Sequence, residues 1–347
     1  MRFYTNQHQF YCGIDLHARS MYVCILDQTG KIVLHRNMKT EPDVFLNAIE
    51  PYREDIAVCS ECMFSWYWLA DLCADEKVPF VLGHALYMRA IHGGKAKNDR
   101  IDSRRIAGLL RSGMIPKAYV YPRKMRATRD LLRRRNYLMR RRADLLAHIQ
   151  NTNAQCNMQE FGRKITYRAN RDGIAEQFSD PNVKMSIKAD LALIDHYDRL
   201  LNEIELFVVR NAKQHDPNTL YLLRTVHGIG KIISLVILYE IHDINRFPRV
   251  QNFASYARLV KCARESAGKR HGTGGHKIGN VHLKWAFSEA AVLFLRDNPA
   301  GMKYKKRLES KHGKAKALSI IAHKLGRAVY YILKNERAFD MDMFLRL

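Results

Sequence analysis

Four acidic side chains in the first third of the chain suit a divalent metal site: Asp15, Glu61, Asp99 and Asp102. Asp15 lies inside the apolar run Cys-Gly-Ile-Asp-Leu-His, where an unpaired charge is costly unless a metal or a hydrogen-bond donor compensates it. Glu61 ends a second apolar run in the same manner. Asp99 and Asp102 are three positions apart, so they share one face of a helical turn.

Carboxylates of this kind are ligands for Mg²⁺ or Mn²⁺, hard ions that keep several waters and accept phosphate oxygens as further ligands. Such an ion neutralises a scissile phosphate and stabilises charge on the attacking and leaving oxygens. For Asp99 alone, a solvated helix cap paired with Arg100 or Arg104 is the simpler interpretation. For the four residues as a set, we favour a metal site.

The chain as a whole is strongly basic. Its 347 residues include 58 lysines and arginines against 34 aspartates and glutamates, which gives a formal net charge of +24. This excess predicts a polyanionic partner that is bound less tightly as salt rises. The hydrophobic fraction of 47% predicts folded cores, in two or three domains. Carboxylates on a basic protein indicate phosphodiester chemistry on nucleic acid. A basic binding protein with structural acids remains an alternative.

The sequence gives no sign of secretion or of membrane insertion. The N-terminus has no signal-peptide pattern, and the most apolar stretch, Ile232 to Tyr239, is too short to cross a bilayer. Seven widely spread cysteines suit reduced thiols better than a disulfide framework. We expect a cytoplasmic, nucleoid-associated bacterial protein without membrane contact.

Residues 1–116 alternate strand and helix signals, which predicts a mixed α/β domain. Three short strands form a meander: Tyr11 to His17, Met21 to Asp27 and Lys31 to Asn37. The following pattern predicts helices over Asp43 to Tyr52 and Trp66 to Asp75, and strands over Ile56 to Cys62 and Pro79 to Leu82.

Residues 117–214 are basic and helical in pattern. Leu131, Leu138 and Leu145 recur every seven residues, and a second apolar stripe runs from Ile187 to Val208. Two long helices are predicted, paired as an antiparallel hairpin or with a partner subunit. Residues 151–181 have no clear periodicity. Six arginines form a candidate rail for a nucleic-acid backbone, although a solvated helix face explains any single one: Arg133, Arg134, Arg135, Arg140, Arg141 and Arg142.

Residues 215–347 are predicted to be mainly helical. The segment His227-Gly-Ile-Gly-Lys231 lies between two apolar helical patterns, as in a helix-hairpin-helix element, where glycines let backbone N–H groups approach a phosphate. Gly228, Gly230 and Lys231 are therefore candidate phosphate contacts. A simple tight turn explains the same pattern.

A basic, glycine-rich segment, Ser266 to Asn280, follows and contributes the candidate contacts Lys269, Arg270 and Lys277. Serine is a weak nucleophile that must be activated by a base, a metal or nearby positive charge. On composition alone Ser266 is a phosphate-contact or turn residue, and Ser255 and Ser288 are equally eligible as nucleophiles. Helices are predicted from Val281 to Arg296 and from Ala315 to Asn335.

Taken in order along nearly the whole chain, these motifs resemble the DEDD insertion-sequence recombinases. The resemblance rests on Gly13-Ile-Asp-Leu-His17, the Glu61 strand, Lys97-Asn-Asp-Arg-Ile-Asp102, Gly228-Ile-Gly230 and the Ser266-to-Asn280 segment. That family comprises the transposases related to the Piv invertase, the bridge-RNA-guided or seekRNA-guided recombinases. Many of its members have Ser-Gly where this chain has Ser266-Ala267-Gly268.

The resemblance implies an RNase H/RuvC-like domain (1–116), a coiled-coil region (117–214) and a helical transposase domain (215–347). Asp15, Glu61, Asp99 and Asp102 match the family's acidic positions, and Ser266 matches its nucleophilic serine. The family's serine forms a covalent phosphoserine link with DNA, without a nucleotide cofactor. A non-coding guide RNA pairs with donor and target duplexes, and tetramers built from dimers complete each active site. A RuvC-like junction resolvase or nuclease, which needs no covalent intermediate, is the alternative.

Overall fold

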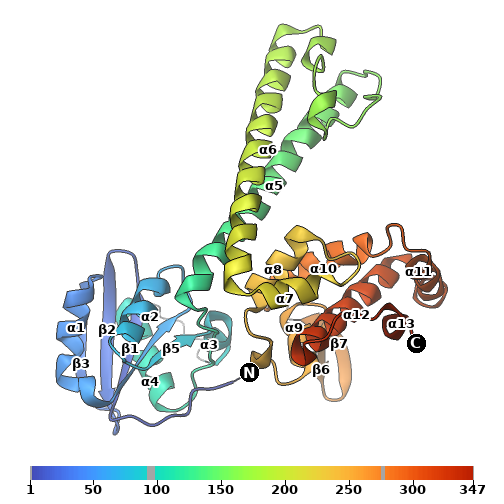
Figure 1. Cartoon of the computed structure of the whole chain (residues 1–347). Coiled ribbons are helices and arrows are strands. Elements are labelled where there is room, and N and C mark those ends of the chain that lie inside the picture. Colours follow the sequence, from blue (N-terminus) through green and yellow to red (C-terminus); the bar gives the residue numbers. More distant parts are fainter. Residues whose placement is uncertain (1, 92–97, 275–277, 347) are drawn as a thin grey trace. The chain divides into compact units, whose positions relative to one another are not determined.

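The computed structural model describes residues 2–91, 98–274 and 278–346 (Figure 1). The chain divides into two compact units, Met1–Arg123 and Lys124–Leu347. Lys277, one of the candidate nucleic-acid contacts, lies outside the described residues. Among the described residues, no helix combines the length and the apolar character needed to cross a bilayer.

The first unit is built on a five-stranded sheet in the order β3-β2-β1-β4-β5. Its first three strands form an antiparallel meander, as predicted, and β4 and β5 continue the sheet parallel to β1. The mixed α/β character of this unit is thereby confirmed. The strands are β1 Phe10–Leu16, β2 Ser20–Asp27, β3 Ile32–Lys39, β4 Ile56–Glu61 and β5 Phe80–Gly83.

The two faces of this sheet are covered by different helices. Alternate residues of β1 point to opposite faces, so Ile14 packs with Phe45 of α1 and Leu69 of α2. Tyr11, on the other face, packs with Leu110 of α4. The helices of the unit are α1 Pro42–Ile49, α2 Trp66–Asp75, α3 Ala85–Ile91 and α4 Asp99–Arg111, with a 3₁₀ turn at Glu50–Asp55.

Helix α4 approaches the sheet unusually closely. It begins after Asn98, whose side-chain oxygen accepts a hydrogen bond from the Ile101 N–H at 2.8 Å and so caps the first turn. Two turns further on, α4 crosses β1 at Gly13, where a Cβ would stand 2.2 Å from the backbone nitrogen of Ala107. Glycine at position 13 is therefore what allows α4 to lie directly on the strand.

The second unit contains two long helices, α5 Arg123–Gln155 and α6 Pro181–His215, which lie side by side (Figure 1). Arg135 pairs with Glu205 and Arg142 with Asp198, so the partner number on α6 falls as the number on α5 rises. The helices are therefore antiparallel, and of the two predicted pairings the hairpin within one chain is observed.

The connector between these helices carries two short 3₁₀ turns, Arg168–Asn170 and Ala175–Gln177. Its apolar side chains complete a small core with Ile149 of α5 and Ile187 of α6; they include Ile165, Ile174 and Phe178. The segment that showed no periodicity is thus ordered by packing, which a search for helical or strand periods does not detect.

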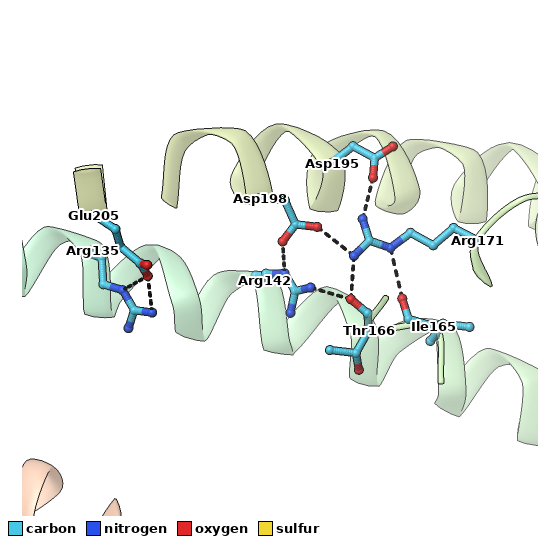
Figure 2. Close-up of polar contacts among 8 residues, drawn as sticks. All are labelled: Arg135, Arg142, Ile165, Thr166, Arg171, Asp195, Asp198 and Glu205. Atoms are coloured by element: carbon cyan, nitrogen blue, oxygen red, sulfur yellow. Dashed lines mark hydrogen bonds and ion pairs between the residues drawn. The ribbon is translucent and has the colours of Figure 1, made fainter. Parts of the chain in front are cut away.

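A partly buried ion-pair network joins the connector to the two long helices (Figure 2). Arg171, only 5% exposed, donates to the carbonyls of Ile165 and Thr166 and pairs with Asp195 and, at 2.7 Å, with Asp198. Arg142 also donates to Asp198, at 2.5 Å. Burial raises the pKa of Asp198, but hydrogen bonds from Arg142 and Arg171 outweigh that effect, so the net change lowers the pKa.

This network predicts a pH-dependent contribution to stability. Because the pKa of Asp198 is lower in the folded than in the unfolded chain, its pairs stabilise the protein above about pH 4, and that contribution is lost as pH falls through the folded value. We expect Asp198→Asn to lower the free energy of unfolding by about 2 kcal/mol at pH 7, with the difference from the unmodified protein shrinking below pH 4. Urea unfolding followed by circular dichroism at pH 7, 5 and 3 measures it. A difference that stays constant over this range would contradict the assignment.

The rest of the second unit is mostly helical around one large core, and the predicted helical character is confirmed. Its helices are α7 Pro217–Arg224, α8 Lys231–Ile241, α9 Val250–Tyr256, α10 Val281–Leu293, α11 Pro299–His312, α12 Lys314–Asn335 and α13 Met341–Leu345, with a 3₁₀ turn at Ile244–Arg246. Three of these helices, α9, α11 and α13, were not predicted. A two-stranded hairpin, β6 Cys262–Ser266 and β7 Lys269–Gly274, interrupts the helices.

Candidate metal site and nucleic-acid contacts

Asp15 and Glu61 lie at the carboxyl ends of neighbouring parallel strands. The last residue pair of β1 and β4 joins Ile14 to Ser60, one residue before each acid. Asp15 is two residues beyond Gly13, and Glu61 is two residues beyond Cys59, which packs with α4 residues. By strand alternation both carboxylates therefore belong to the face of the sheet that α4 covers.

The first turn of α4 brings the other two acids to the same face. Asp99 and Asp102 both lie in that turn, where the positive end of the helix dipole favours negative charge. The side chain of His35, on β3, bonds the Arg100 carbonyl at 2.9 Å and so ties the beginning of α4 to the sheet. The structure thus places Asp99 near Asp15, while Asp102 forms an ion pair with Arg105 at 3.3 Å.

His17 completes a cluster with two of the acids. Its Nε2 atom lies 3.5 Å from Asp15 Oδ2 and 3.6 Å from Asp99 Oδ2. One ligand atom from each of the three residues lies within 4.8 Å of the other two. Glu61 and Asp102 do not belong to this tight group, so the structure brings two of the four predicted carboxylates together closely.

The electrostatics of Asp15 suit cation binding. Its side chain is 17% exposed, and burial raises its pKa. His17 acts in the opposite direction, and the charges of Asp99 and Asp102 raise the pKa further. The ionised form of Asp15 is therefore disfavoured until a positive charge is supplied, and a divalent ion supplies it.

Sequence reasoning did not include His17 among the candidate ligands. The signal was present, because His17 stands two residues after Asp15 at the end of a strand and so shares its face. No sequence pattern showed that Asp99 approaches the same imidazole nitrogen as Asp15, because that depends on how α4 packs across Gly13.

The donor set fits a divalent cation. Two carboxylates from separate elements, with an imidazole nitrogen between them, offer oxygen ligands for Mg²⁺ and a nitrogen that Mn²⁺ also accepts. Asp99 is 56% exposed at its side chain, so the cluster is open to solvent and to a phosphate on that side. A divalent metal bound here would be held by Asp15, His17 and Asp99.

The structure divides the six arginines of the predicted rail. Arg133, Arg135 and Arg142 are held by carboxylates inside the protein: Arg133 donates twice to buried Glu240, at 2.6 and 2.8 Å, and Arg135 donates to Glu205. Their guanidinium groups form ion pairs within the fold. The exposed members are Arg134, Arg140 and Arg141.

The two glycines of the turn between α7 and α8 lie in different surroundings. Gly228 is closely packed against the backbone of α10, and Gly230 is not. Gly228 has a φ of 86°, and a Cβ there would stand 2.5 Å from the Phe294 nitrogen. Gly230 has open space around it and is the N-cap residue of α8. Lys231 pairs with Glu205 at 3.7 Å. The interpretation as a simple tight turn explains Gly228. At Gly230 there is room for a phosphate to approach the backbone.

Ser266 lies beside the turn of the β6–β7 hairpin. It pairs with Lys269 across a two-residue turn, Ala267-Gly268, in which both residues have positive φ angles of 49° and 73°. This is the backbone of a tight hairpin turn, and it holds Ser266 and Lys269 exposed at the tip. Arg270 belongs to β7. Ser266 belongs to the second unit and the acidic cluster to the first.

Two family models match this chain. A model of DEDD transposases of the IS110 group, described as "Transposase", matches residues 12–156, which include all four candidate carboxylates. A model described as "Transposase IS116/IS110/IS902 family" matches residues 220–306, which include Ser266. A search among curated proteins finds no match. The chain thus carries both domains of these enzymes and is an IS110-family transposase, a DNA-recombining enzyme of the DEDD type.

Proposed function

We propose that this transposase is an RNA-guided recombinase related to the Piv invertase, which cleaves DNA through a phosphoserine intermediate at Ser266 with Mg²⁺ at the acidic cluster. The observation that carries the metal part is the convergence of Asp15 and Asp99 on one imidazole. The strand order of the first unit, with α4 across β1, supports an RNase H/RuvC-like domain.

In the proposed reaction, the Ser266 oxygen attacks the scissile phosphorus and loses its proton to solvent. It displaces a deoxyribose oxygen, which takes a proton from solvent and leaves as a hydroxyl. The new phosphoserine bond keeps the energy of the broken phosphodiester, so a second deoxyribose hydroxyl can reverse the step without a nucleotide cofactor. Exposure of Ser266 at the hairpin tip supports this role, because a DNA backbone can reach it. A metal held by Asp15, His17 and Asp99 would stabilise the negative charge that develops on the phosphate oxygens.

Two further features belong to the proposal. The net charge of +24 would attract the guide RNA and both DNA duplexes. Arg134, Arg140 and Arg141 are exposed cations on α5 that would contact them. Ser266 of one subunit would act with the acidic cluster of another in a tetramer built from dimers. The proposed domains are residues 1–116, 117–214 and 215–347. In this assembly the first domain of one subunit would work with the third domain of another.

One experiment tests these statements together. The protein is purified at moderate salt with its accompanying RNA, the RNA is sequenced, and the complex is mixed with labelled DNA carrying the element's junctions and with Mg²⁺. We expect one discrete RNA with segments complementary to the junctions, and a protein–DNA adduct that resists SDS. Ser266→Ala should form no adduct. Ser288→Ala, which changes an exposed serine on α10, is the matched control and should react normally.

Mixing the two inactive variants tests the shared active site. Asp15→Asn and Ser266→Ala proteins, each inactive alone, should together form an adduct on the Asp15→Asn subunit, because only that subunit keeps its serine. DNA cleavage by Ser266→Ala without an adduct would overturn the phosphoserine mechanism in favour of a RuvC-like nuclease. A heterogeneous mixture of RNA, or none, would overturn the guided mechanism.

A further inference from the structure

A pocket of about 290 Å³ lies between α5 and α10 in the second unit. This volume is near the lower end of the range of about 300–1,000 Å³ that small-molecule sites occupy. We call it the α5–α10 pocket; the lining residues used below are Asn136, Met139 and Arg140 of α5 and Val281, His282 and Trp285 of α10.

The walls of the α5–α10 pocket combine a flat aromatic ring with an apolar mouth. Trp285 is partly buried, while Met139 and Val281 are 40% and 51% exposed. Asn136 and His282 add polar groups to the lining. A tryptophan ring offers a stacking surface to any nucleobase, and an asparagine amide can bond a base edge.

Arg140 supplies the positive charge of the pocket. Its Nε donates to the Asn136 carbonyl at 3.3 Å, and among the described residues no carboxylate lies within ion-pair distance of it. Arg135, which also lines the pocket, is by contrast neutralised by Glu205. Burial lowers the pKa of His282, so this side chain adds a neutral hydrogen-bonding group. The unpaired cation beside an aromatic ring suits a ligand with a flat base and a phosphate.

We propose that the α5–α10 pocket binds an unpaired nucleotide of the nucleic acid on which the transposase acts, with the base against Trp285 and its phosphate at Arg140. A base within a duplex is stacked on its neighbours, so only a single-stranded or extruded nucleotide can enter. The site rests on nucleic-acid binding by this chain and is independent of the metal and of Ser266. It would hold an unpaired position of a DNA or RNA strand in a fixed register.

The test measures binding of fluorescent ten-residue oligothymidylate, oligouridylate and a paired duplex to the full chain without metal. Trp285→Leu should weaken binding of the single strands about tenfold, because one stacked base is lost. Trp285→Phe should retain most of the affinity, since the smaller ring still stacks. Arg140→Gln should lower the slope of log affinity against log salt by about one.

Arg307→Gln is the matched control, because Arg307 is an exposed arginine on α11 that neither lines the pocket nor belongs to the candidate nucleic-acid contacts. On binding of a single strand, quenching of tryptophan fluorescence should be unchanged in Arg307→Gln and reduced in Arg140→Gln. The tighter of the two single strands identifies DNA or RNA as the source of the nucleotide. Equal affinities for Trp285→Leu and the unmodified protein, or equal losses with the duplex, would overturn the proposal. Neither result bears on cleavage at Ser266, so the two proposals fail separately.

Discussion

Replacing Asp15 by Asn is expected to reduce DNA cleavage about 1,000-fold while the protein stays folded. Asn has the shape of Asp but no charge. The cluster of Asp15, His17 and Asp99 therefore loses the charge of its least exposed ligand. A reduction of this size corresponds to about 4 kcal/mol of lost transition-state stabilisation, which is within what a bound metal supplies. Cleavage rates at saturating Mg²⁺, with enzyme in excess over labelled DNA, measure the effect.

The same substitution should change stability in opposite directions with and without metal. Because burial and neighbouring acids raise the pKa of Asp15, its charge opposes folding at pH 7 when no cation is bound. In EDTA, Asp15→Asn should therefore unfold at a higher temperature than the unmodified protein. In Mg²⁺ or Mn²⁺ only the unmodified protein should gain stability, by ligand binding to the folded state.

Asp43→Asn is the control for this pair of measurements, because Asp43 is exposed in the first turn of α1 and does not belong to the cluster. It should leave both the cleavage rate and the metal-induced gain in melting temperature unchanged. If Asp15→Asn kept the metal-induced gain, the ion would have to bind elsewhere, and the cluster of Asp15, His17 and Asp99 would not be the metal site.

The acidic residues of the first unit were predictable because strand alternation and helical spacing are local properties. Asp15 lies inside one apolar run and Glu61 ends another, and Asp99 and Asp102 share one face of a helical turn, all of which the sequence displays. Their convergence was not predictable in the same way. It depends on α4 crossing β1, a contact between segments about ninety residues apart that is set by packing at Gly13.

The arginines of α5 show a second limit of pattern reasoning. Arg134, Arg135 and Arg142 are equivalent by composition, yet only the last two face carboxylates of α6. Arg171 was not singled out at all, because its partners lie on α6 and its own segment has no period. Which arginine remains available to nucleic acid is decided by tertiary pairing.

The hairpin that carries Ser266 was missed for a different reason. Hairpins with a two-residue turn usually announce themselves by Asn-Gly or Asp-Gly, whose residues tolerate positive φ. Here the turn is Ala267-Gly268, and alanine at a φ of 49° is an uncommon choice. The α11 helix was missed because few of its side chains are buried, Tyr304 and Leu308 among them, which leaves a weak apolar stripe.

Gly13→Ala is expected to lower the free energy of unfolding by about 3 kcal/mol and to slow DNA cleavage about 100-fold. The added methyl group would stand 2.2 Å from the Ala107 nitrogen and 2.4 Å from the Ser103 carbonyl oxygen. Both are backbone atoms of α4, so the clash is relieved only if the helix moves off the strand, which is an overpacking cost. The first turn of α4 carries Asp99 and would move with it, and a shift of about 1 Å at a catalytic group costs about 100-fold in rate.

Gly108→Ala on the same helix separates this effect from a general response of α4 to alanine. A Cβ at Gly108 meets no atom within 4 Å, and alanine favours a helix over glycine by about 1 kcal/mol, so this variant should be more stable and fully active. Urea unfolding and single-turnover cleavage measure both variants. Because Asp15 is unchanged in Gly13→Ala, a loss of metal-induced stabilisation there would show that the distance between β1 and α4 controls the metal site. Normal cleavage by Gly13→Ala would mean that Asp99 does not need its place beside Asp15.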